Sequence, residues 1–241
     1  MSRAPKRSDF TDYRGRVFRL VEDQYRISTS RLANSLLDEE RLELLADNAK
    51  PNIPAEARGL HRLLATPFRY GHRTESRFRK AGERPGIFYA SETQATCLFE
   101  MAYWRLRFYA ASPSAQISST TTEHLMFSVG IDANHALDLT RASFNSAPSI
   151  WTDPADYQSC QRFAAQARRL GAQLVRYESA RDPNGGINVA VLKANCFDGP
   201  MPEAEGTWYF RFSNGRLNAI AASPSTGRHI FDFSQFGLAH A

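Results

Sequence analysis

The sequence predicts an α+β fold, and three features of its pattern carry that prediction. Short apolar runs that resemble strands recur along the chain, and several longer stretches have helical apolar spacing. No regular βαβ repeat, internal repeat or low-complexity tract is present. The 241 residues, of which 42% are hydrophobic, suffice for one large domain with its own core.

The first part of the chain is expected to contain one strand, one helix and a polar connector. Residues 1–15 predict a flexible N-terminus, and RVFRLVED at 16–23 predicts an opening strand. LLDEERLELLADNA at 36–49 has the spacing of an amphipathic helix that ends before Lys50-Pro51. We interpret the region near 36–60 as a helical insertion in a single domain that spans 16–241.

The middle of the chain has the clearest strand-to-helix pattern. GIFYA at 86–90 predicts a strand, and a helix is expected at 92–110. Ser91 and Gln94 stand at the spacing of a capping box. The expected buried strip of this helix consists of Ala95, Leu98, Ala102 and Leu106, and Glu100 falls close to it.

The remaining elements are expected to be short strands around one further helix. That helix follows Asp153-Pro154 and ends at Gly171, a glycine suited to a C-terminal cap. An Asn-Gly turn predicts a C-terminal hairpin near 207–222. The other predicted strands cover 124–131, 136–140, 172–179 and 187–193.

The net charge of +5 is concentrated in one arginine-rich segment. Residues 58–84 hold eight Lys or Arg residues against two glutamates, with aromatic residues between them. Arginine presents a planar fork of donors that suits phosphate and carboxylate. The segment is therefore either an anion site for a nucleotide or nucleic acid, or a solvated basic loop.

Several classes of protein lack their signature in this sequence. No apolar run has the length of a membrane helix or of a signal peptide core. The three cysteines have neither disulfide-framework nor zinc spacing, which suits a cytoplasmic location and gives no metal ligands. Phosphate-binding glycine loops and the GxSxG nucleophile turn are also absent.

Four residues with chemically active side chains follow one another at a characteristic spacing. Arg79 is followed ten residues later by Tyr89 and eleven residues further by Glu100 in the predicted helix. Ser179 ends a predicted strand just before a Gly-Gly-containing loop. This pattern, together with Ser91 and Asn188, resembles the RES-domain proteins, a family named for an arginine, a glutamate and a serine. The resemblance covers roughly residues 16–198 and adds Arg19 of the opening VFRLV run as a match.

The sequence departs from the family pattern at two places. The stretch between Arg19 and Arg79 is longer than in compact members, which is why 36–60 is interpreted as an insertion. Arg77-Phe78 stands where a glycine pair is usual, so either Arg77 or Arg79 can be the functional arginine; the spacing to Tyr89 favours Arg79.

The resemblance implies a fold similar to that of ADP-ribosyltransferases, in which a split β-sheet and flanking helices form a cleft. It implies cleavage of the nicotinamide–ribose bond of NAD, by water or by inorganic phosphate, in a toxin that depletes NAD. NAD is then a substrate, with no cofactor needed. A helix-turn-helix antitoxin is the implied partner. The sequence leaves open whether the protein also forms a homo-oligomer.

The implied catalytic residues are Arg79, Tyr89, Glu100 and Ser179. Glu100 would stabilise the oxocarbenium-like ribose, and Arg79, with Arg19 or Arg77, would bind the diphosphate. Tyr89 would stack its ring on nicotinamide and contact the ribose or the amide through its hydroxyl. Ser179 would hydrogen-bond the ribose or the nicotinamide amide. The substrate-binding set is Arg19, Arg77, Ser91 and Asn188.

Each of these residues also has an ordinary structural interpretation, and two other activities are alternatives. Glu100 can be a solvent-facing acid, Tyr89 a core residue, Ser179 a cap and Arg77 a surface charge. Transfer of ADP-ribose to a protein is one alternative, although Leu98 stands where such transferases often carry a second acid. A nucleic-acid binder built on 58–84 is the other, although no known binding module is recognisable.

Overall fold

The structure, a computed structural model, describes most of the chain. The described residues are 3–22, 41, 51–111, 121–144, 148–223 and 227–239. Apart from Arg41, which is helical, the helix predicted at 36–49 lies outside these residues, as does the part of the predicted insertion before residue 51. None of the described helices is long and apolar enough to cross a membrane.

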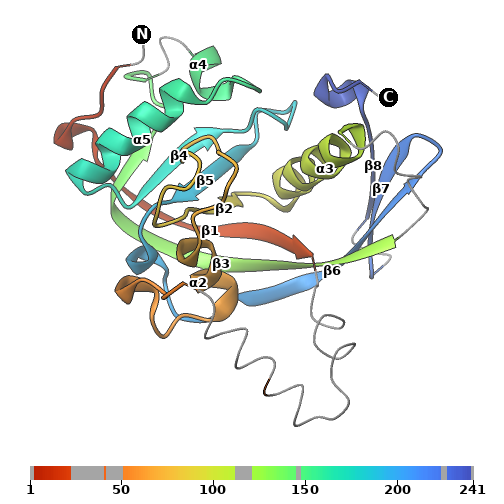
Figure 1. Cartoon of the computed structure of the whole chain (residues 1–241), viewed down its shortest axis with the longest axis horizontal. Helices are drawn as coiled ribbons and strands as arrows, with labels where there is room; N and C mark the ends of the chain where they lie inside the picture. The colour runs from red at the N-terminus through yellow and green to blue at the C-terminus, as the bar shows by residue number, and fades with distance from the viewer. Residues whose placement is uncertain are drawn as a thin grey trace.

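The described elements confirm an α+β fold (Figure 1). The helices are α2 (Arg62–Arg69), α3 (Gln94–Ala110), α4 (Pro148–Thr152) and α5 (Gln158–Leu170), with short 3-10 turns at Arg7–Asp9, Ala55–Ala57, Ala194–Cys196 and Ser234–Phe236. The strands are β1 (Thr11–Glu22), β2 (Phe88–Ser91), β3 (Thr121–Asp138), β4 (Leu174–Glu178), β5 (Ile187–Val191), β6 (Glu203–Ser213), β7 (Arg216–Ala221) and β8 (Arg228–Asp232).

The strands form one mixed sheet that splits along β3. The order is β1-β2-β5-β4-β3-β6-β7-β8, and β1 also pairs with β3. One edge of β3 pairs with β6 over 121–128 and with β4 only at 136–138, so two arms diverge from it. The first arm, β4-β5-β2, returns to β1, whereas the second, β6-β7-β8, extends away (Figure 1). The predicted split sheet is confirmed.

Two strand predictions need correction because β1 and β3 form a long ladder that reaches from the Glu22–His124 pair to the Thr11–Ala136 pair, with one irregularity. β1 begins at Thr11, so residues 11–15 belong to the sheet and not to a flexible N-terminus. The runs predicted at 124–131 and 136–140 belong to one strand, which ends at Asp138, so residues 139 and 140 lie beyond it. Its polar middle, which has the composition of a turn, is held extended by β1: Asp132 pairs with Arg14 and their side chains form an ion pair. Tertiary pairing here overrides local propensity.

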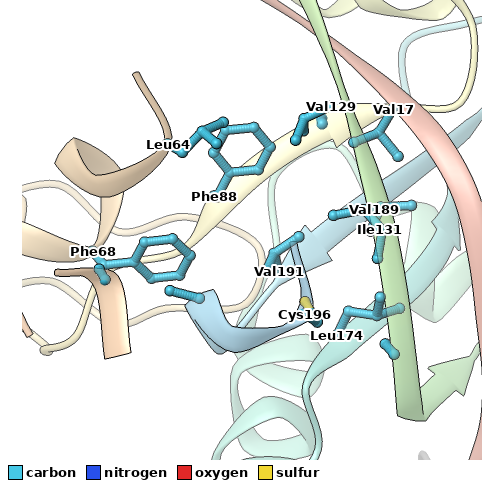
Figure 2. Close-up of a cluster of buried hydrophobic side chains, with 14 of the residues drawn as sticks. Val17, Leu64, Phe68, Phe88, Val129, Ile131, Leu174, Val189, Val191 and Cys196 are labelled. Carbon is cyan, nitrogen blue, oxygen red and sulfur yellow. The ribbon is translucent and has the colours of Figure 1, made fainter. Parts of the chain in front are cut away.

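Apolar side chains fill the space between the first arm and α2. Figure 2 shows Leu64 and Phe68 of α2 directed toward Phe88 of β2, with Val17 and Val129 in the same cluster. A second cluster packs α5 on the other face of this arm through Phe163 and Ala190. Burial of both faces explains why β5 is an almost continuous apolar run.

Helix α3 packs on the second arm through the predicted strip. Leu98, Ala102 and Leu106 are buried against aromatic residues of β6 and β8, whereas Ala95, expected in this strip, is exposed. The cap is Thr93, whose side chain accepts a hydrogen bond from the Thr96 N–H. The predicted capping role of Ser91 is therefore wrong, because Ser91 is the last residue of β2.

Of three further predictions about local structure, two are confirmed and one is wrong. The hairpin of β6 and β7 turns at Asn214-Gly215, where both residues have positive φ, as such turns require. Gly171 caps α5 in the left-handed conformation, as predicted. Asp153 does not cap α5, which begins five residues later; its carboxylate accepts hydrogen bonds from the N–H groups of Ala155 and Asp156.

Candidate active site

A cavity of about 610 Å³ lies where β1, β2 and α3 meet the loop that follows α2. Seven of the eight residues predicted for the site line it: Arg19, Arg77, Arg79, Tyr89, Ser91, Glu100 and Asn188. The eighth, Ser179, is buried directly behind Glu100. The folded chain thus brings together residues that are up to 169 positions apart in the sequence, from Arg19 to Asn188.

Glu100 is held by one of its two carboxylate oxygens. Oε1 accepts a hydrogen bond from Ser179 Oγ at 2.7 Å and another from Asn188 Nδ2 at 2.6 Å. Among the described residues Oε2 has no hydrogen-bond partner, and no cation forms an ion pair with this carboxylate. Glu100 is therefore a half-buried acid that is oriented by neutral donors and faces the cavity.

Ser179 is fixed as a donor to Glu100 by the loop that follows it. Its Oγ accepts hydrogen bonds from the Arg181 N–H at 3.0 Å and from the Asp182 N–H at 3.1 Å. A hydroxyl has two lone pairs and one hydrogen, so that hydrogen is left for Glu100 Oε1. Ser179 thus orients Glu100 from behind, whereas the sequence led us to expect direct contact with a ribose or an amide.

Asn188 and Ser91 form a second route to the same carboxylate. They are opposite each other in the β2–β5 ladder, which places their side chains on one face. Ser91 Oγ donates to Asn188 Oδ1 at 2.7 Å, so the amide of Asn188 turns its Nδ2 toward Glu100. Both residues are buried. Ser91 therefore acts on Glu100 through Asn188, although it also lines the cavity.

Tyr89 turns its hydroxyl away from the expected substrate contact. The hydroxyl accepts a hydrogen bond from the Phe78 N–H at 3.1 Å and lies 2.9 Å from Ser76 Oγ. Burial raises the pKa of Tyr89, so the hydroxyl stays protonated. The ring lines the cavity, and the hydroxyl holds the 76–78 loop in place.

Arg79 is buried and ties together the loop between α2 and β2. Its guanidinium donates to three backbone carbonyls: those of His72 at 3.2 Å, Thr74 at 2.7 Å and Lys80 at 2.8 Å. These bonds use three of its five N–H donors. The interpretation of residues 58–84 as a merely solvated basic loop does not hold for this arginine, which is 3% exposed.

Arg77 and Arg19 approach the cavity from two directions. Arg77 donates to the Trp151 carbonyl at 2.6 Å and is buried, so it is not a surface charge. Arg19 donates to the Tyr89 carbonyl at 2.7 Å and lies over the Phe88 ring. Arg19 Nε is buried without a hydrogen-bond partner, and burial lowers the pKa of this guanidinium.

Sequence reasoning missed two residues that flank Ser179. Tyr177 and Arg181 stand two positions before and two positions after it, and both line the cavity. For Tyr177 a signal exists, because residues i and i+2 of a strand face the same side. For Arg181, which lies in an irregular loop, no sequence pattern predicts the direction of the side chain.

The cavity holds more positive than negative side-chain charge. Four arginines line it, against Glu75 and Glu100, and within the described chain none of the four forms an ion pair. The Cys97 thiol also lines the cavity, but burial raises its pKa to about 12, which makes it a poor nucleophile. The described residues contain no group of three His, Cys, Asp or Glu side chains that could hold a metal ion. The site is suited to an anionic ligand.

Comparison with known proteins identifies the family of the chain. A search of curated proteins finds no match. Among solved structures, the chain is similar to the M. tuberculosis MbcT–MbcA toxin–antitoxin complex, at 13% identity and a TM-score of 0.47, over 90% of this chain and 88% of that chain. Residues 53–213, about two thirds of the sequence, match the RES domain and contain every predicted site residue except Arg19. The chain therefore belongs to the RES-domain family.

Proposed function

We propose that the protein cleaves the nicotinamide–ribose bond of NAD in the cavity around Glu100. The observation that carries this proposal is the asymmetry of the Glu100 carboxylate. One oxygen is held by Ser179 and Asn188, and the other has no partner among the described residues, in a cavity lined by arginines. Such a fixed, unneutralised carboxylate suits a reaction in which positive charge develops on the substrate.

The chemistry of NAD matches a site with a single acid. Nicotinamide is already cationic at its ring nitrogen, so it leaves as a neutral base without needing a proton. Positive charge then develops on the ribose, and a preorganised carboxylate stabilises that charge in the transition state. Because Glu100 is oriented before the substrate arrives, little reorganisation accompanies the reaction.

The arginines supply the complementary charge for the diphosphate. Arg79 has two N–H donors left after its three carbonyl bonds, and Arg19 and Arg77, which each make one bond to a carbonyl, line the same cavity. Charge-assisted hydrogen bonds from such groups are the usual means of holding phosphate. The ring of Tyr89 offers a surface for stacking on nicotinamide, since its hydroxyl is occupied by the 76–78 loop.

The biological role that we propose is that of a toxin that lowers NAD in the cytoplasm. Membership of the RES-domain family supports this role, and a helix-turn-helix antitoxin would be its partner. The acceptor of the ribosyl group is water or inorganic phosphate.

The two alternatives find less support in the described residues. Leu98, where a second acid often stands in ADP-ribosyltransferases, is buried in the core against the second arm. Arg77 and Arg79 of the basic segment are buried inside the protein and bonded to its own backbone, so they are not presented to a nucleic-acid backbone.

The proposal is tested by incubating the purified protein with NAD, with and without orthophosphate, and separating the products by chromatography. We expect release of nicotinamide in amounts equal to the NAD consumed. Free ADP-ribose would identify water as the acceptor, and ADP-ribose 1″-phosphate would identify phosphate. Intact NAD after prolonged incubation under both conditions would reject the proposed function.

A further inference from the structure

Tyr177 is a buried cavity residue whose hydroxyl has no partner. It is 6% exposed, and its hydroxyl makes no hydrogen bond with the described residues. Among the described residues, the side-chain polar atoms that are fully buried without a partner belong to Arg19, Arg105 and His124, so the Tyr177 hydroxyl opens to the cavity. Its ring is fixed edge-on against Phe78 at 4.8 Å. A polar group left unsatisfied at such a position calls for a ligand.

Arg181 is held in a fixed position and still has free donors. Its guanidinium carbon lies 3.4 Å from the centre of the Tyr103 ring. One terminal nitrogen donates to the Pro154 carbonyl at 2.8 Å and to the Tyr157 hydroxyl at 3.3 Å. Within the described chain the other terminal nitrogen and Nε make no hydrogen bond. Arg181 is 7% exposed, so its charge is buried without a counter-ion.

Arg77 lies against Tyr157, the tyrosine whose hydroxyl accepts a hydrogen bond from Arg181. Its guanidinium is 5.1 Å from the centre of the Tyr157 ring. The positive charges of Arg77 and Arg181 both act on the Asp153 carboxylate. The pKa of Asp153 is lowered first by hydrogen bonds from the N–H groups of Asp156 and Ala155, and then by the two arginines. Asp153 forms no ion pair with either arginine, so it does not neutralise them.

These three side chains gather at the Glu100 end of the cavity. The backbone N–H of Arg181 bonds Ser179 Oγ, which in turn donates to Glu100. Tyr103, on which Arg181 stacks, is one helical turn from Glu100 on α3. The fields of Glu100 and Arg77 both act on the Tyr177 hydroxyl, whose pKa is raised well above its usual value mainly by burial, so it remains a donor.

Arg19 and Arg79 form a separate pair. They are held by the Tyr89 carbonyl and by the 72–80 loop, and both lower the pKa of His72, after the larger effect of burial. The cavity therefore has two groups of cationic donors, Arg19 with Arg79 and Arg77 with Arg181. Of these, the second group is linked to Glu100, through the bond from the Arg181 N–H to Ser179.

We propose that Tyr177, Arg77 and Arg181 form a subsite for a phosphate-class oxyanion beside Glu100. All three present donors and none has a neutralising partner, which is the arrangement that recognises an anion with several acceptor oxygens. The oxyanion has two candidate sources, the diphosphate of NAD and free orthophosphate. The role of the subsite in the reaction rests on the proposed function. Its binding of an oxyanion does not, and can be measured in a protein that does not cleave NAD.

With orthophosphate as the source, the step balances without an added acid or base. An anionic oxygen of hydrogen phosphate forms a bond to the ribose C1″, and the bond from C1″ to nicotinamide breaks. The bonding electron pair leaves with the nicotinamide nitrogen and neutralises it. The proton of hydrogen phosphate stays on the new ester.

The test measures binding in protein whose turnover is blocked by Glu100→Gln. In this background Tyr177→Phe removes one hydroxyl, and Arg181→Met keeps the stem on Tyr103 and removes the charge. The matched control is Arg162→Met, at an exposed arginine of α5 whose side chain bonds Ser159 and no other described residue. Orthophosphate, ADP-ribose and NAD are titrated separately by calorimetry, with thermal unfolding as a check that each variant folds.

We expect Arg181→Met to weaken binding of the relevant oxyanion by about ten- to a hundredfold and Tyr177→Phe by about tenfold. Loss for orthophosphate identifies free phosphate as the ligand, and loss confined to ADP-ribose and NAD identifies the diphosphate. The control should bind all three as the parent does. Folded variants that bind all three ligands like the parent would overturn the subsite, even if the wild type cleaves NAD. Conversely, weakened phosphate binding in the variants, together with a wild type that leaves NAD intact, would keep the subsite and reject the function.

Discussion

Two neighbouring residues of β4, Arg176 and Tyr177, point to opposite faces of the sheet and enter two different polar clusters. On one face Arg176 makes a bidentate ion pair with Glu92, at 2.7 and 2.9 Å, and a further pair with Asp138 at 3.2 Å. Tyr13 also donates to Glu92. On the other face, Tyr177 and Arg181 line a cavity with no ion pair among the described residues.

The difference between the clusters is whether the charges are already satisfied. In the Arg176 cluster each charge has an opposite partner, and the hydrogen bond to Glu92 raises the pKa of Arg176 further. In the cavity, Glu100 meets only neutral donors and the arginines meet backbone carbonyls and aromatic rings. Complete pairing stabilises a fold, whereas charges held in place without partners are available to a ligand.

The largest expected effect is on catalysis, from Glu100→Gln. The amide oxygen can still accept the bonds from Ser179 and Asn188, so the fold should keep its thermal midpoint. Loss of the negative charge opposite the developing cation should lower the rate of nicotinamide release by about a hundred- to a thousandfold. Steady-state kinetics with NAD measure this, and a rate within a factor of three of the wild type would remove Glu100 from the mechanism.

A buried titratable group outside both clusters should affect stability and not catalysis. His124 of β3 has an unsatisfied Nε2, and burial lowers its pKa to about 4. Because the unfolded chain takes up this proton near pH 6.5 and the folded chain only near pH 4, the free energy of unfolding falls as the pH falls through that window, by up to about 3 kcal/mol.

Replacement of His124 by Gln should flatten that dependence. Denaturant unfolding of wild type and variant between pH 7 and pH 4 measures it, and nicotinamide release at pH 7.5 serves as the control that should not change. Parallel pH profiles of the two proteins would show that His124 does not titrate as described.

Glu92→Gln should lower stability and leave catalysis nearly unchanged, which is the reverse of the effect expected for Glu100→Gln. It leaves Arg176 with Asp138 as its ion-pair partner, and the pair with Glu92 is about three quarters buried at each side chain. We expect a loss of about 2 kcal/mol in unfolding free energy, or some 4–8 °C in thermal midpoint. The rate of NAD cleavage at 25 °C should stay close to that of the wild type, and a drop as large as that for Glu100→Gln would erase the distinction between the clusters.

The smallest expected effect comes from Ser179→Ala. The variant removes one of the two bonds to Glu100 Oε1 and leaves Asn188 in place, so we expect kcat to fall about tenfold with little change in KM for NAD. A rise in KM with unchanged kcat would indicate that Ser179 contacts the substrate instead of orienting Glu100. Kinetics over a range of NAD concentrations separate these outcomes.

The sequence predicted the order of the helices and strands, and which residues lie together around the cavity, better than the contacts that those residues make. The spacing of Arg79, Tyr89, Glu100 and Ser179 correctly indicated residues that meet around one cavity. It did not reveal that the hydroxyl of Tyr89 is occupied by the 76–78 loop, or that Ser179 acts behind Glu100. Such contacts depend on loops packed by distant residues, and spacing along the chain contains no information on side-chain direction there.

The same limit explains the errors in the fold. Residues 132–135 have the composition of a turn, yet they are strand because β1 pairs with residues 132, 133 and 136, and the Gln173 side chain accepts hydrogen bonds from the N–H groups of Asn134 and His135. Ser91 stands at capping distance from Gln94, yet the strand ladder with Asn188 takes it into β2 and Thr93 becomes the cap. In both cases a partner far away in sequence decides between two locally acceptable structures.

The most direct test of the account compares Glu100→Gln with Glu92→Gln in one assay of nicotinamide release from NAD. The two variants make the same chemical change eight residues apart, at the unpaired and at the paired carboxylate. We expect nicotinamide release to be lost with Glu100→Gln and retained with Glu92→Gln, while only Glu92→Gln lowers the thermal midpoint. Equal loss in both variants, or full release with Glu100→Gln, would contradict it.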